Sequence, residues 1–179
     1  MSMNSHEERE CSREFETALG RCGLSWSEHG ITSVLLPAVR IHARTPRSEA
    51  ADVPAAIRDA IDAIVALLDG EPRDLRSIAL DERGVDEFRR RVYAATRAVG
   101  PGETASYGEI ARAIGAPHDA RAVGAALARN PFPIVVPCHR VLAADGALHG
   151  YSAPGGLRTK RRMLEIEGAP GFTQQPLFA

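Results

Sequence analysis

Two stretches of the chain carry hydrophobic residues at the spacing of an amphipathic helix. The first, Ala55–Leu68, begins after Pro54 and is followed by Gly70, and its apolar positions recur every three or four residues. The second, Val85–Val99, repeats this pattern and ends at Gly100. Each stretch therefore predicts one helix with a single buried face.

Shorter apolar runs on either side of Gly30 have the composition of strands. Leu24–Trp26 precedes this glycine and Ile31–Arg40 follows it, so we predict a strand in each run. Ser77–Leu80 is a further candidate for a short strand within a mostly polar segment. The polar segment ends in turn-forming residues, which indicates a domain boundary near Asp81–Gly84.

These elements predict an α+β fold with two domains. Residues 1–84 are expected to form a small N-terminal α/β domain with a short sheet, in which residues 1–12 are frayed. Residues 85–179 are expected to form a mostly helical C-terminal domain, in which residues 169–179 are a tail.

The C-terminal domain contains a pair of short predicted helices. Ser106 and Glu109 have the spacing of a capping box that opens the first helix. After the turn Gly115–His118, Asp119 is a good N-cap for a second helix, Ala120–Arg129. Two helices across a tight turn are typical of the helix-turn-helix that binds DNA, and equally of an ordinary helical hairpin. The pattern alone leaves both interpretations open.

Composition narrows the class of protein. Hydrophobic residues make up 44% of the 179 residues and charged residues 25%, which is typical of a globular protein. No apolar run approaches the ~18 residues that a membrane span needs, and the first residues lack the apolar core of a secretory signal. The three cysteines are too few for a disulfide framework. We therefore expect a cytoplasmic protein with no membrane partner.

Charge divides unevenly along the chain. The formal net charge is −1, but residues 1–84 carry 10 basic and 15 acidic side chains, whereas residues 85–179 carry 12 and 8. Net charges of −5 and +4 follow, and the basic second half favours a polyanionic partner. Among the 22 basic residues, Lys160 is the only lysine.

The candidate chemistry follows the pair of short helices. Phe132–Pro137 cannot continue a helix and predicts an extended chain that leads into Cys138. A thiol reacts as its thiolate, so it needs a base or a cation nearby; His139 and Arg140 are adjacent, and Glu167 can orient a histidine. Successive side chains of an extended chain point apart, so contact with His139 requires a turn or a bridging water. A buried, inert Cys138 remains the alternative.

The segment Pro137–Val141, which reads PCHRV, resembles the active-site motif of the O6-alkylguanine-DNA alkyltransferases, also called methylated-DNA–protein-cysteine methyltransferases. The resemblance extends over about residues 85–168, and four further blocks keep the family's order and spacing. These blocks are Thr104–Glu109, Arg121–Gly124, Asn130–Pro131 and Glu167–Gly168. Together they are far more specific than the five-residue motif alone.

The resemblance implies roles for four residues at the reacting centre. Cys138 would accept the alkyl group, and His139 would act through a water as the base for its thiol. Glu167 would orient and polarise His139, and Asn130 would brace the turn between the second helix and the active-site strand. Taken without the resemblance, Asn130 is a simple helix C-cap and Glu167 an exposed carboxylate at a helix end.

The resemblance also implies a pocket for the guanine. Tyr107 would donate a hydrogen bond to the base, and the carbonyls of Cys138 and Val141 would recognise its exocyclic amine. Tyr151 and Ser152 would belong to the loop of this pocket, with Ser152 close to the alkylated oxygen. Taken alone, Tyr107 is equally well explained as a core aromatic.

The implied DNA contacts lie on the second helix of the pair. The target oxygen is inside the stacked duplex, so the base must rotate out, at a cost of a few kcal/mol. Arg121 would enter the duplex where the base has left, since a guanidinium both stacks and donates hydrogen bonds. Ala122, Gly124 and Ala125 are small and would let the helix approach DNA closely. Taken alone, Arg121 is a solvated helix charge.

The implied function is DNA repair by irreversible alkyl transfer in a single turnover, because the product is a thioether with a poor leaving group. This transfer requires no metal, nucleotide or organic cofactor. The expected partner is double-stranded DNA containing O6-alkylguanine, and the protein is expected to be a monomer. One alternative is a non-catalytic helix-turn-helix binder of alkylated DNA, although such relatives lose the cysteine. Another is a cysteine hydrolase or redox sensor, for which no resolving cysteine or oxyanion loop is evident.

The chain departs from the family pattern in two places. After Tyr151–Ser152, the residues Ala153–Pro154 delay the paired glycines by about two positions, which bears on the size of the alkyl pocket. The first half also lacks the spacing of the structural zinc site that some relatives hold, and we expect no metal there. The residues considered for such a site are Cys11, Cys22, His29 and His42.

Overall fold

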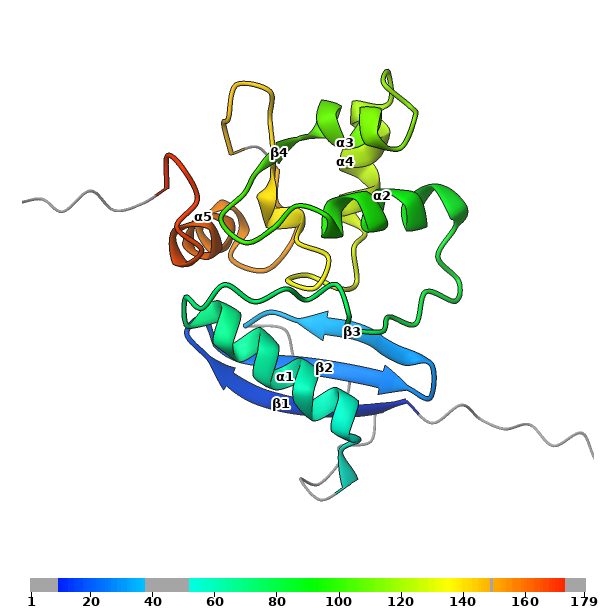
Figure 1. Ribbon diagram of the computed structural model, residues 1–179, viewed down its shortest axis with the longest axis vertical. Coiled ribbons are helices and arrows are strands. Elements are labelled where there is room, and N and C mark those ends of the chain that lie inside the picture. The colour runs from blue at the N-terminus through cyan, green and yellow to red at the C-terminus, as the bar shows by residue number, and fades with distance from the viewer. Residues whose placement is uncertain (1–9, 38–51, 149, 173–179) are drawn as a thin grey trace, which may run out of the picture.

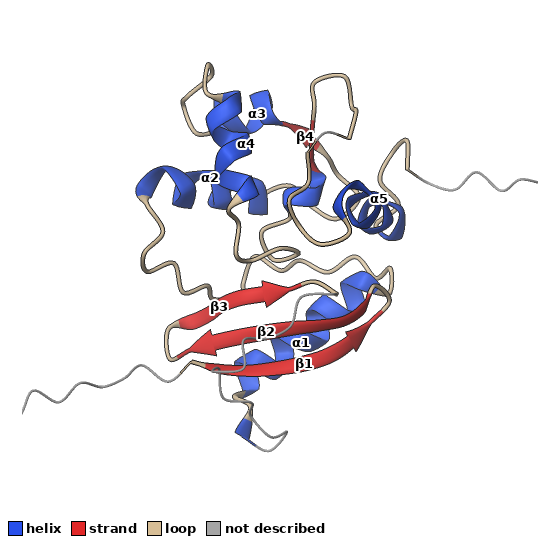
Figure 2. Ribbon diagram, turned by 180° about the vertical axis from the view of Figure 1, so that it is seen from behind, coloured by secondary structure: helices blue, strands red, loops and turns tan. Residues whose placement is uncertain are grey.

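The computed structural model describes residues 10–37, 52–148 and 150–172, which form two parts that face each other (Figure 1). One part is a three-stranded antiparallel sheet with a long helix across one face. The other part holds the remaining helices and a two-stranded parallel ladder, and it lies on the β3 side of the sheet (Figure 2). None of the helices within these ranges is long and apolar enough to cross a membrane.

The sheet consists of β1 (Cys11–Thr17), β2 (Gly20–Ser27) and β3 (Gly30–Leu35), in that spatial order. Two-residue connections join neighbouring strands, so the chain forms a meander. The strands predicted on either side of Gly30 are confirmed as β2 and β3. Strand β2 extends beyond the predicted Leu24–Trp26 at both ends, whereas β3 begins one residue earlier than predicted and ends five residues sooner.

Strand β1 corrects the expectation that residues 1–12 are frayed. Cys11 and Ser12 already pair with β2, and Ser12 is fully buried. Most side chains of β1 are polar or charged, so the hydrophobic pattern did not reveal it. Its ladder of hydrogen bonds to β2, rather than its own composition, holds it in the sheet.

Two strand predictions are shortened by the structure. The predicted strand Ile31–Arg40 ends at Leu35, because Pro37 has no N–H with which to continue a ladder. Its last three residues lie outside the described residues. The candidate strand Ser77–Leu80 is reduced to a single parallel bridge between its last residue and β3.

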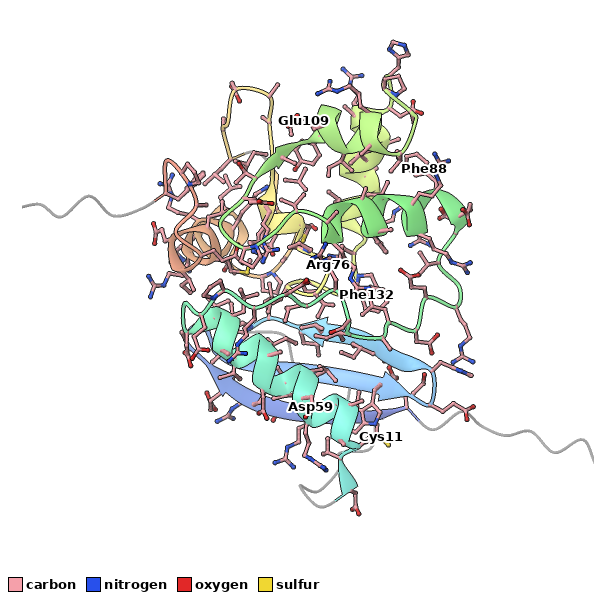
Figure 3. All side chains as sticks on the ribbon, in the orientation of Figure 1. Cys11, Asp59, Arg76, Phe88, Glu109 and Phe132 are labelled. Atoms are coloured by element: carbon pink, nitrogen blue, oxygen red, sulfur yellow. The ribbon has the colours of Figure 1, made fainter. Side chains whose placement is uncertain are left out.

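Helix α1 spans Ala55–Leu68, the bounds that the hydrophobic spacing predicted. Figure 3 shows Asp59 on the outer face of this helix, away from the sheet. The opposite face supplies the buried residues Ile57, Ala60, Ile64, Leu67 and Leu68. The apolar residues of α1 recur at helical spacing along its whole length, which explains why the sequence predicted its bounds.

Four helices form most of the second part. They are α2 (Glu87–Arg97), α3 (Tyr107–Ala113), α4 (Ala120–Ala128) and α5 (Gly156–Ile166). Helices α3 and α4 are the predicted pair joined by a turn, and they pack on α2. A short parallel ladder joins β4 (Ala105–Ser106) to a strand that follows the PCHRV motif.

The helix starts follow from their caps. The carboxylate of Asp86 accepts a hydrogen bond from the Arg89 N–H, so α2 begins two residues later than predicted. The predicted capping box is confirmed, since Ser106 and Glu109 each accept from the other's backbone N–H. The predicted N-cap Asp119 is wrong in one respect: its side chain makes no cap hydrogen bond. Its φ of −101° and ψ of 28° differ from the extended backbone of a capping residue.

One hydrophobic cluster runs from the sheet and α1 into α2, α3 and α4. Phe132 lies at the junction of the two parts (Figure 3) and meets Tyr93 edge-on, with ring centroids 6.2 Å apart. Beside it, the Val34 N–H of β3 donates to the Pro131 carbonyl at 2.9 Å. The chain that leads to Cys138 is therefore held against β3 on one side and α2 on the other.

Candidate active site

The chain before Cys138 is a turn, not the extended segment that Phe132–Pro137 predicted. The Val136 N–H donates to the Phe132 carbonyl at 2.8 Å, and Ile134 has a φ of 75°. The side chain of Asn130 closes this turn, accepting from the Phe132 N–H and donating to the Val136 carbonyl, each at 2.9 Å. A positive φ is rare and costly for isoleucine, and the bonds to Asn130 help to hold the turn in this conformation.

The motif itself forms a single 3-10 turn, Cys138–Arg140, which continues into β5 (Val141–Leu142). The predicted opposition of successive side chains on an extended chain therefore does not apply. All three side chains of the turn are buried, and Cys138 retains 8% exposure. The thiol faces a cavity, whereas His139 and Arg140 bond to Glu167 at the end of α5.

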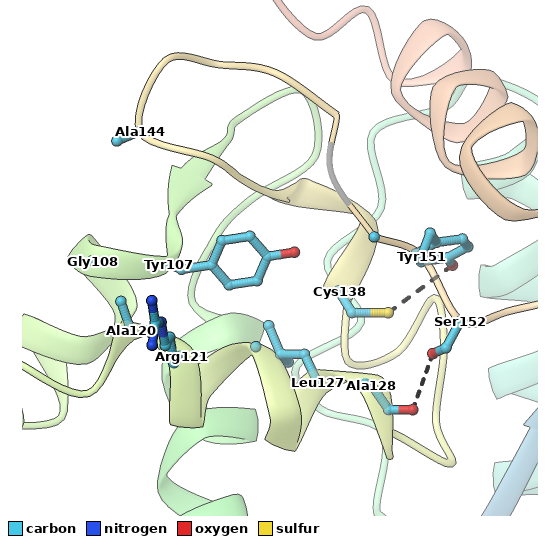
Figure 4. A pocket seen from close by; sticks show the side chains of 12 residues that line it. Tyr107, Gly108, Ala120, Arg121, Leu127, Ala128, Cys138, Ala144, Tyr151 and Ser152 are labelled. Carbon is cyan, nitrogen blue, oxygen red and sulfur yellow. Dashed lines mark hydrogen bonds between the residues drawn. The ribbon is translucent and has the colours of Figure 1, made fainter.

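The cavity has a volume of about 810 Å³ and lies between α3, α4 and the loop that precedes α5 (Figure 4). Figure 4 shows Arg121 at one end, the sulfur of Cys138 near the other, and the ring of Tyr107 between them. Six of the residues singled out from the sequence line it: Tyr107, Arg121, Gly124, Cys138, Tyr151 and Ser152. The fold thus brings a possible nucleophile, two aromatic rings and an arginine to one open space.

The small residues of α4 separate into two groups. Gly124 lies beside the Tyr107 ring, and a Cβ at this position would be 3.8 Å from two ring atoms. Ala122 and Ala125 are exposed on the helix but do not line the cavity. The outer surface of α4 is therefore free of large side chains at these two positions.

Behind the turn, three charged or titratable side chains form a compact network. His139 Nε2 and Glu167 Oε1 are 2.8 Å apart, and Arg140 donates to both carboxylate oxygens of Glu167 at 2.8 and 2.9 Å. Arg140 also donates to the Val99 carbonyl at 2.6 Å. The side chains of His139 and Glu167 are each 1% exposed, so Glu167 is not the solvated helix-end residue considered from the sequence.

The network determines the charge of His139 and which of its ring nitrogens carries the hydrogen. Burial acts to raise the pKa of Glu167, but its bonds to His139 and Arg140 outweigh burial and hold that pKa at about 2. Burial lowers the pKa of His139 despite Glu167, and the positive charge of Arg140 acts in the same direction. The pair is therefore a carboxylate and a neutral imidazole. Because a carboxylate only accepts, Nε2 carries the hydrogen and Nδ1 keeps its lone pair.

Nδ1 of His139 is buried and has no hydrogen-bond partner within the described part of the chain. An unpaired buried acceptor is unusual and costs free energy. No hydrogen bond joins Cys138 to His139 among the described residues. The arrangement can accept a proton at Nδ1.

Burial raises the pKa of the Cys138 thiol above its usual value. The Asn130 amide, the Tyr151 hydroxyl and the charge of Lys160 act to lower this pKa but do not outweigh burial. Cys138 Sγ and the Tyr151 hydroxyl oxygen are 4.0 Å apart. Burial raises the pKa of Tyr151 strongly, so its hydroxyl keeps its proton and can donate to a thiolate.

Lys160 is a residue of the site that the sequence reasoning missed. It is fully buried, and its Nζ donates to the Val141 carbonyl at 2.6 Å. The same Nζ lies 5.9 Å from the ring centre of Tyr107 and 5.8 Å from that of Tyr151. Burial lowers its pKa to about 8. Its being the only lysine in an arginine-rich chain was the available signal, but burial cannot be read from composition.

Two residues singled out from the sequence already have partners. The Ser152 hydroxyl donates to the Ala128 carbonyl at 3.0 Å, which ties the loop to the end of α4 (Figure 4). The Val141 carbonyl accepts from Lys160. For Arg140, the sequence indicated only that it lies close to Cys138. It did not indicate that Arg140 bonds to Glu167.

Three of the four residues considered for a zinc site lie in the described part of the chain. Cys11 and Cys22 lie on β1 and β2 as free cysteines, His29 is in the turn that follows β2, and His42 lies outside the described residues. No group of three His, Cys, Asp or Glu side chains within the described ranges is placed to hold a metal ion.

Comparison with known proteins identifies similar chains. The family described as "6-O-methylguanine DNA methyltransferase, DNA binding domain" matches residues 87–169. A protein of Methanothermobacter thermautotrophicus named methylated-DNA–protein-cysteine methyltransferase is 39% identical over 147 residues, which are 82% of this chain and 78% of that protein. A protein of the same name from Mycobacterium tuberculosis is 46% identical over 125 residues, which are 70% and 73% of the two chains.

Solved structures give the same result for the fold. The Mycobacterium tuberculosis protein OGT, crystallised in complex with DNA, superposes with a TM-score of 0.72 at 35% identity, over 90% of this chain and 96% of that one. The O6-methylguanine-DNA methyltransferase of Pyrococcus kodakaraensis superposes with a TM-score of 0.65 at 26% identity, over 89% and 99%. The mixed α/β architecture, which in the described part of this chain comprises small sheets and five α-helices, thus matches these proteins in overall fold.

Proposed function

The chain belongs to the methylated-DNA–protein-cysteine methyltransferase family, and from this premise we propose that Cys138 takes an alkyl group directly from O6 of guanine in duplex DNA. Its activity is accordingly DNA repair by transfer to a cysteine. The observation that carries the assignment to Cys138 is that its thiol opens onto the cavity shared with Tyr107 and Arg121.

The transfer is a substitution at carbon. The Cys138 thiolate attacks the alkyl carbon, a carbon–sulfur bond forms, and the bond from carbon to the guanine oxygen breaks. The electron pair of the broken bond stays on the base, which takes up one proton to become guanine. The product is a thioether whose sulfur is a poor leaving group, so each molecule acts once and the transfer itself requires no cofactor.

The network behind the turn prepares the thiol. The free lone pair on His139 Nδ1 is the proton acceptor, and a water between Nδ1 and the sulfur completes the path. Glu167 holds the imidazole in the required tautomer, and Arg140 keeps Glu167 ionised. The Tyr151 hydroxyl then donates to the thiolate as its charge develops.

Helices α3 and α4 act in this proposal as a helix-turn-helix on DNA. The exposed small residues Ala122 and Ala125 permit close approach of α4 to the duplex. Arg121 fills the space that the rotated base leaves, and Tyr107 donates a hydrogen bond to the base in the cavity. All of these residues come from one chain, so a monomer suffices.

Intact mass after incubation with a duplex containing O6-methylguanine tests the proposal. We expect one methyl group per protein, located on Cys138 and absent in Cys138→Ala. Cys22→Ala is the matched control, because Cys22 is also buried but lies in the sheet, and this variant should still be methylated. An unmodified protein that binds the duplex would instead indicate a non-catalytic binder, and ester hydrolysis or thiol oxidation without methylation would indicate cysteine chemistry of another class.

A further inference from the structure

The turn that joins α2 to β4, residues 99–103, contacts the buried network behind Cys138 (Figure 1). Its Val99 carbonyl accepts from Arg140 at 2.6 Å. Its Gly102 N–H donates to Glu167 Oε2 at 3.4 Å. This turn, which we call the α2–β4 turn, therefore bonds to both members of the buried ion pair.

The bond from Gly102 completes the set of donors around Glu167. A carboxylate has about four positions at which it accepts hydrogen bonds. Oε1 is 2.8 Å from His139 Nε2 and accepts from Arg140 Nη2 at 2.9 Å, and Oε2 accepts from Arg140 Nε at 2.8 Å. Gly102 supplies the fourth donor, and among the four it is the one on the main chain. A main-chain amide neither titrates nor changes rotamer, so it is a fixed reference for the carboxylate.

The position of Gly102 admits no side chain. Its φ is 76°, a conformation that glycine adopts readily and other residues rarely do. A Cβ at this position would be 2.9 Å from the main-chain carbonyl oxygen of Glu167. Because that distance is too short for a real contact, any larger residue must push the turn and Glu167 apart.

The α2–β4 turn is itself held in one conformation. The Glu103 N–H donates to the Gly100 carbonyl at 3.1 Å, and the Glu103 carboxylate accepts from the Gly100 N–H at 2.9 Å. The Val99 N–H donates to the carbonyl of Thr96, a fully buried residue of α2. The core packing of α2 thus determines where the Gly102 amide lies.

We propose that Gly102 is a positioning residue for the reaction: its amide orients Glu167 and so determines how readily His139 takes the proton of Cys138. The inference rests on the proposed function, because it concerns the base that prepares the thiol for transfer. It gives the α2–β4 turn a role in the chemistry, whereas the sequence indicated only the end of a helix there.

The consequence for the thiol has a defined dependence on pH. If Glu167 shifts, it accepts less well from His139 Nε2, Nδ1 becomes less basic, and the apparent pKa of Cys138 rises. A rise of one unit lowers the thiolate fraction about tenfold below that pKa and has no effect well above it. A general disturbance of the fold would instead slow the reaction equally at every pH. The titratable and charged groups that face the thiol or Glu167 stay unchanged in every variant below: Tyr93, Tyr107, His139, Arg140, Tyr151 and Lys160.

The test measures alkylation of Cys138 by iodoacetamide in the full chain, because this reagent reports the thiolate without DNA. The modified peptide is quantified by mass, which separates Cys138 from the other cysteines. Gly102→Ala is compared with Gly84→Ala, the matched control: Gly84 has a φ of 80°, and a Cβ there meets nothing within 4 Å. We expect Gly102→Ala to react about tenfold more slowly near pH 7, with the difference fading above about pH 9, and Gly84→Ala to keep the unaltered rate throughout.

A second variant loosens the turn without adding a side chain at Gly102. Glu103→Ala removes the bond to the Gly100 N–H, and we expect the same profile with a loss of about threefold near pH 7, the effect of a half-unit shift. If Gly102→Ala does not fold, as judged by its thermal transition, Glu103→Ala decides the question.

Three results would overturn the inference: an unchanged rate in the deciding variant, a loss of the same factor at every pH, or an equal loss in Gly84→Ala. The proposed function fails separately. If the unaltered protein takes no methyl group from a duplex containing O6-methylguanine, the repair activity is refuted, whereas the iodoacetamide profiles still show whether Gly102 acts on the thiol.

Discussion

The two sides of the active-site turn differ in how tightly their side chains are bonded to one another. Behind it, His139, Arg140 and Glu167 are joined by bonds of 2.8–2.9 Å and are almost inaccessible to solvent. In front of it, Cys138 meets the Tyr151 hydroxyl at 4.0 Å and borders an open cavity. Fixed charges thus lie on the side that does not face the cavity, and the reactive side is left loosely bonded so that a substrate can enter.

The closed side should show the largest effect on stability. Glu167→Gln keeps a hydrogen-bond acceptor for His139 but leaves the buried Arg140 without its counter-charge. Breaking a buried ion pair in this way costs about 3–5 kcal/mol, so we expect the free energy of unfolding to fall by that amount. Urea unfolding measures this change, and the rate of methyl transfer near neutral pH should fall with it because the imidazole loses its anionic partner.

A double variant separates these two effects. Replacing Arg140 and Glu167 together by methionine removes both buried charges and fills similar volume, which is often tolerated. We expect stability to recover in part while methyl transfer remains slow, since His139 then has no acceptor for its Nε2 hydrogen. Recovery of the rate along with stability would mean that the network is only structural.

Acid should weaken the same network. The pKa of Glu167 is about 2 in the folded protein, below the ~4.3 of an unfolded glutamate. Its contribution is therefore fully present above about pH 4.3 and is lost as the pH falls toward 2, to a total of about 3 kcal/mol. Urea midpoints measured across this pH range should fall steeply in the unaltered protein and less steeply in Glu167→Gln.

The end of the open side away from the thiol should respond to the state of the DNA. Arg121 is exposed at the end of the cavity away from the thiol, so Arg121→Ala should leave folding intact. If this side chain replaces the rotated base, transfer from duplex DNA should slow by about tenfold to a hundredfold, which is the scale of a few kcal/mol for base rotation. Transfer from the free base O6-methylguanine should change little. Equal losses with both substrates would exclude the role in base rotation.

Lys160 lies between the two sides and should have a smaller effect. Its charge acts to lower the pKa of Cys138, so Lys160→Met should move the pH midpoint of the transfer rate upward and slow transfer at pH 7 by about threefold to tenfold. Because burial holds the pKa of Lys160 at about 8, the difference from the unaltered protein should shrink above that pH. A pH–rate profile tests this, and a constant difference at every pH would show that the charge does not act on the sulfur.

The sequence predicted some elements better than others. An element was predicted well when the pattern that stabilises it lies within its own residues, and poorly when it depends on contacts with other segments. Helix α1 carries its full amphipathic period within Ala55–Leu68, so its bounds were readable. Strand β1 is mostly polar and depends on β2, so its own pattern predicted nothing. The turn at Ile134 is braced by the side chain of Asn130, a role that the family resemblance implied and that the hydrophobic pattern did not indicate.

The prediction of the site was limited in the same way. The family motif placed Cys138, His139 and Glu167 together, and the structure brings the last two within 2.8 Å. The motif gave no indication that Lys160 is buried against the Val141 carbonyl, because that contact joins α5 to β5 across the fold. Residues whose role depends on packing between distant segments were therefore the ones missed.

The smallest expected effect concerns the two helices beneath the open side, whose starts look alike in sequence and differ in structure. Ser106 accepts from the Glu109 N–H at 3.1 Å, so Ser106→Ala should lower the free energy of unfolding by about 1 kcal/mol. Asp119 makes no such bond, so Asp119→Ala should change it by less than about 0.5 kcal/mol. Urea unfolding of the two variants side by side measures the difference. Equal destabilisation would mean that Asp119 caps α4 in solution and that the two helices start in the same way.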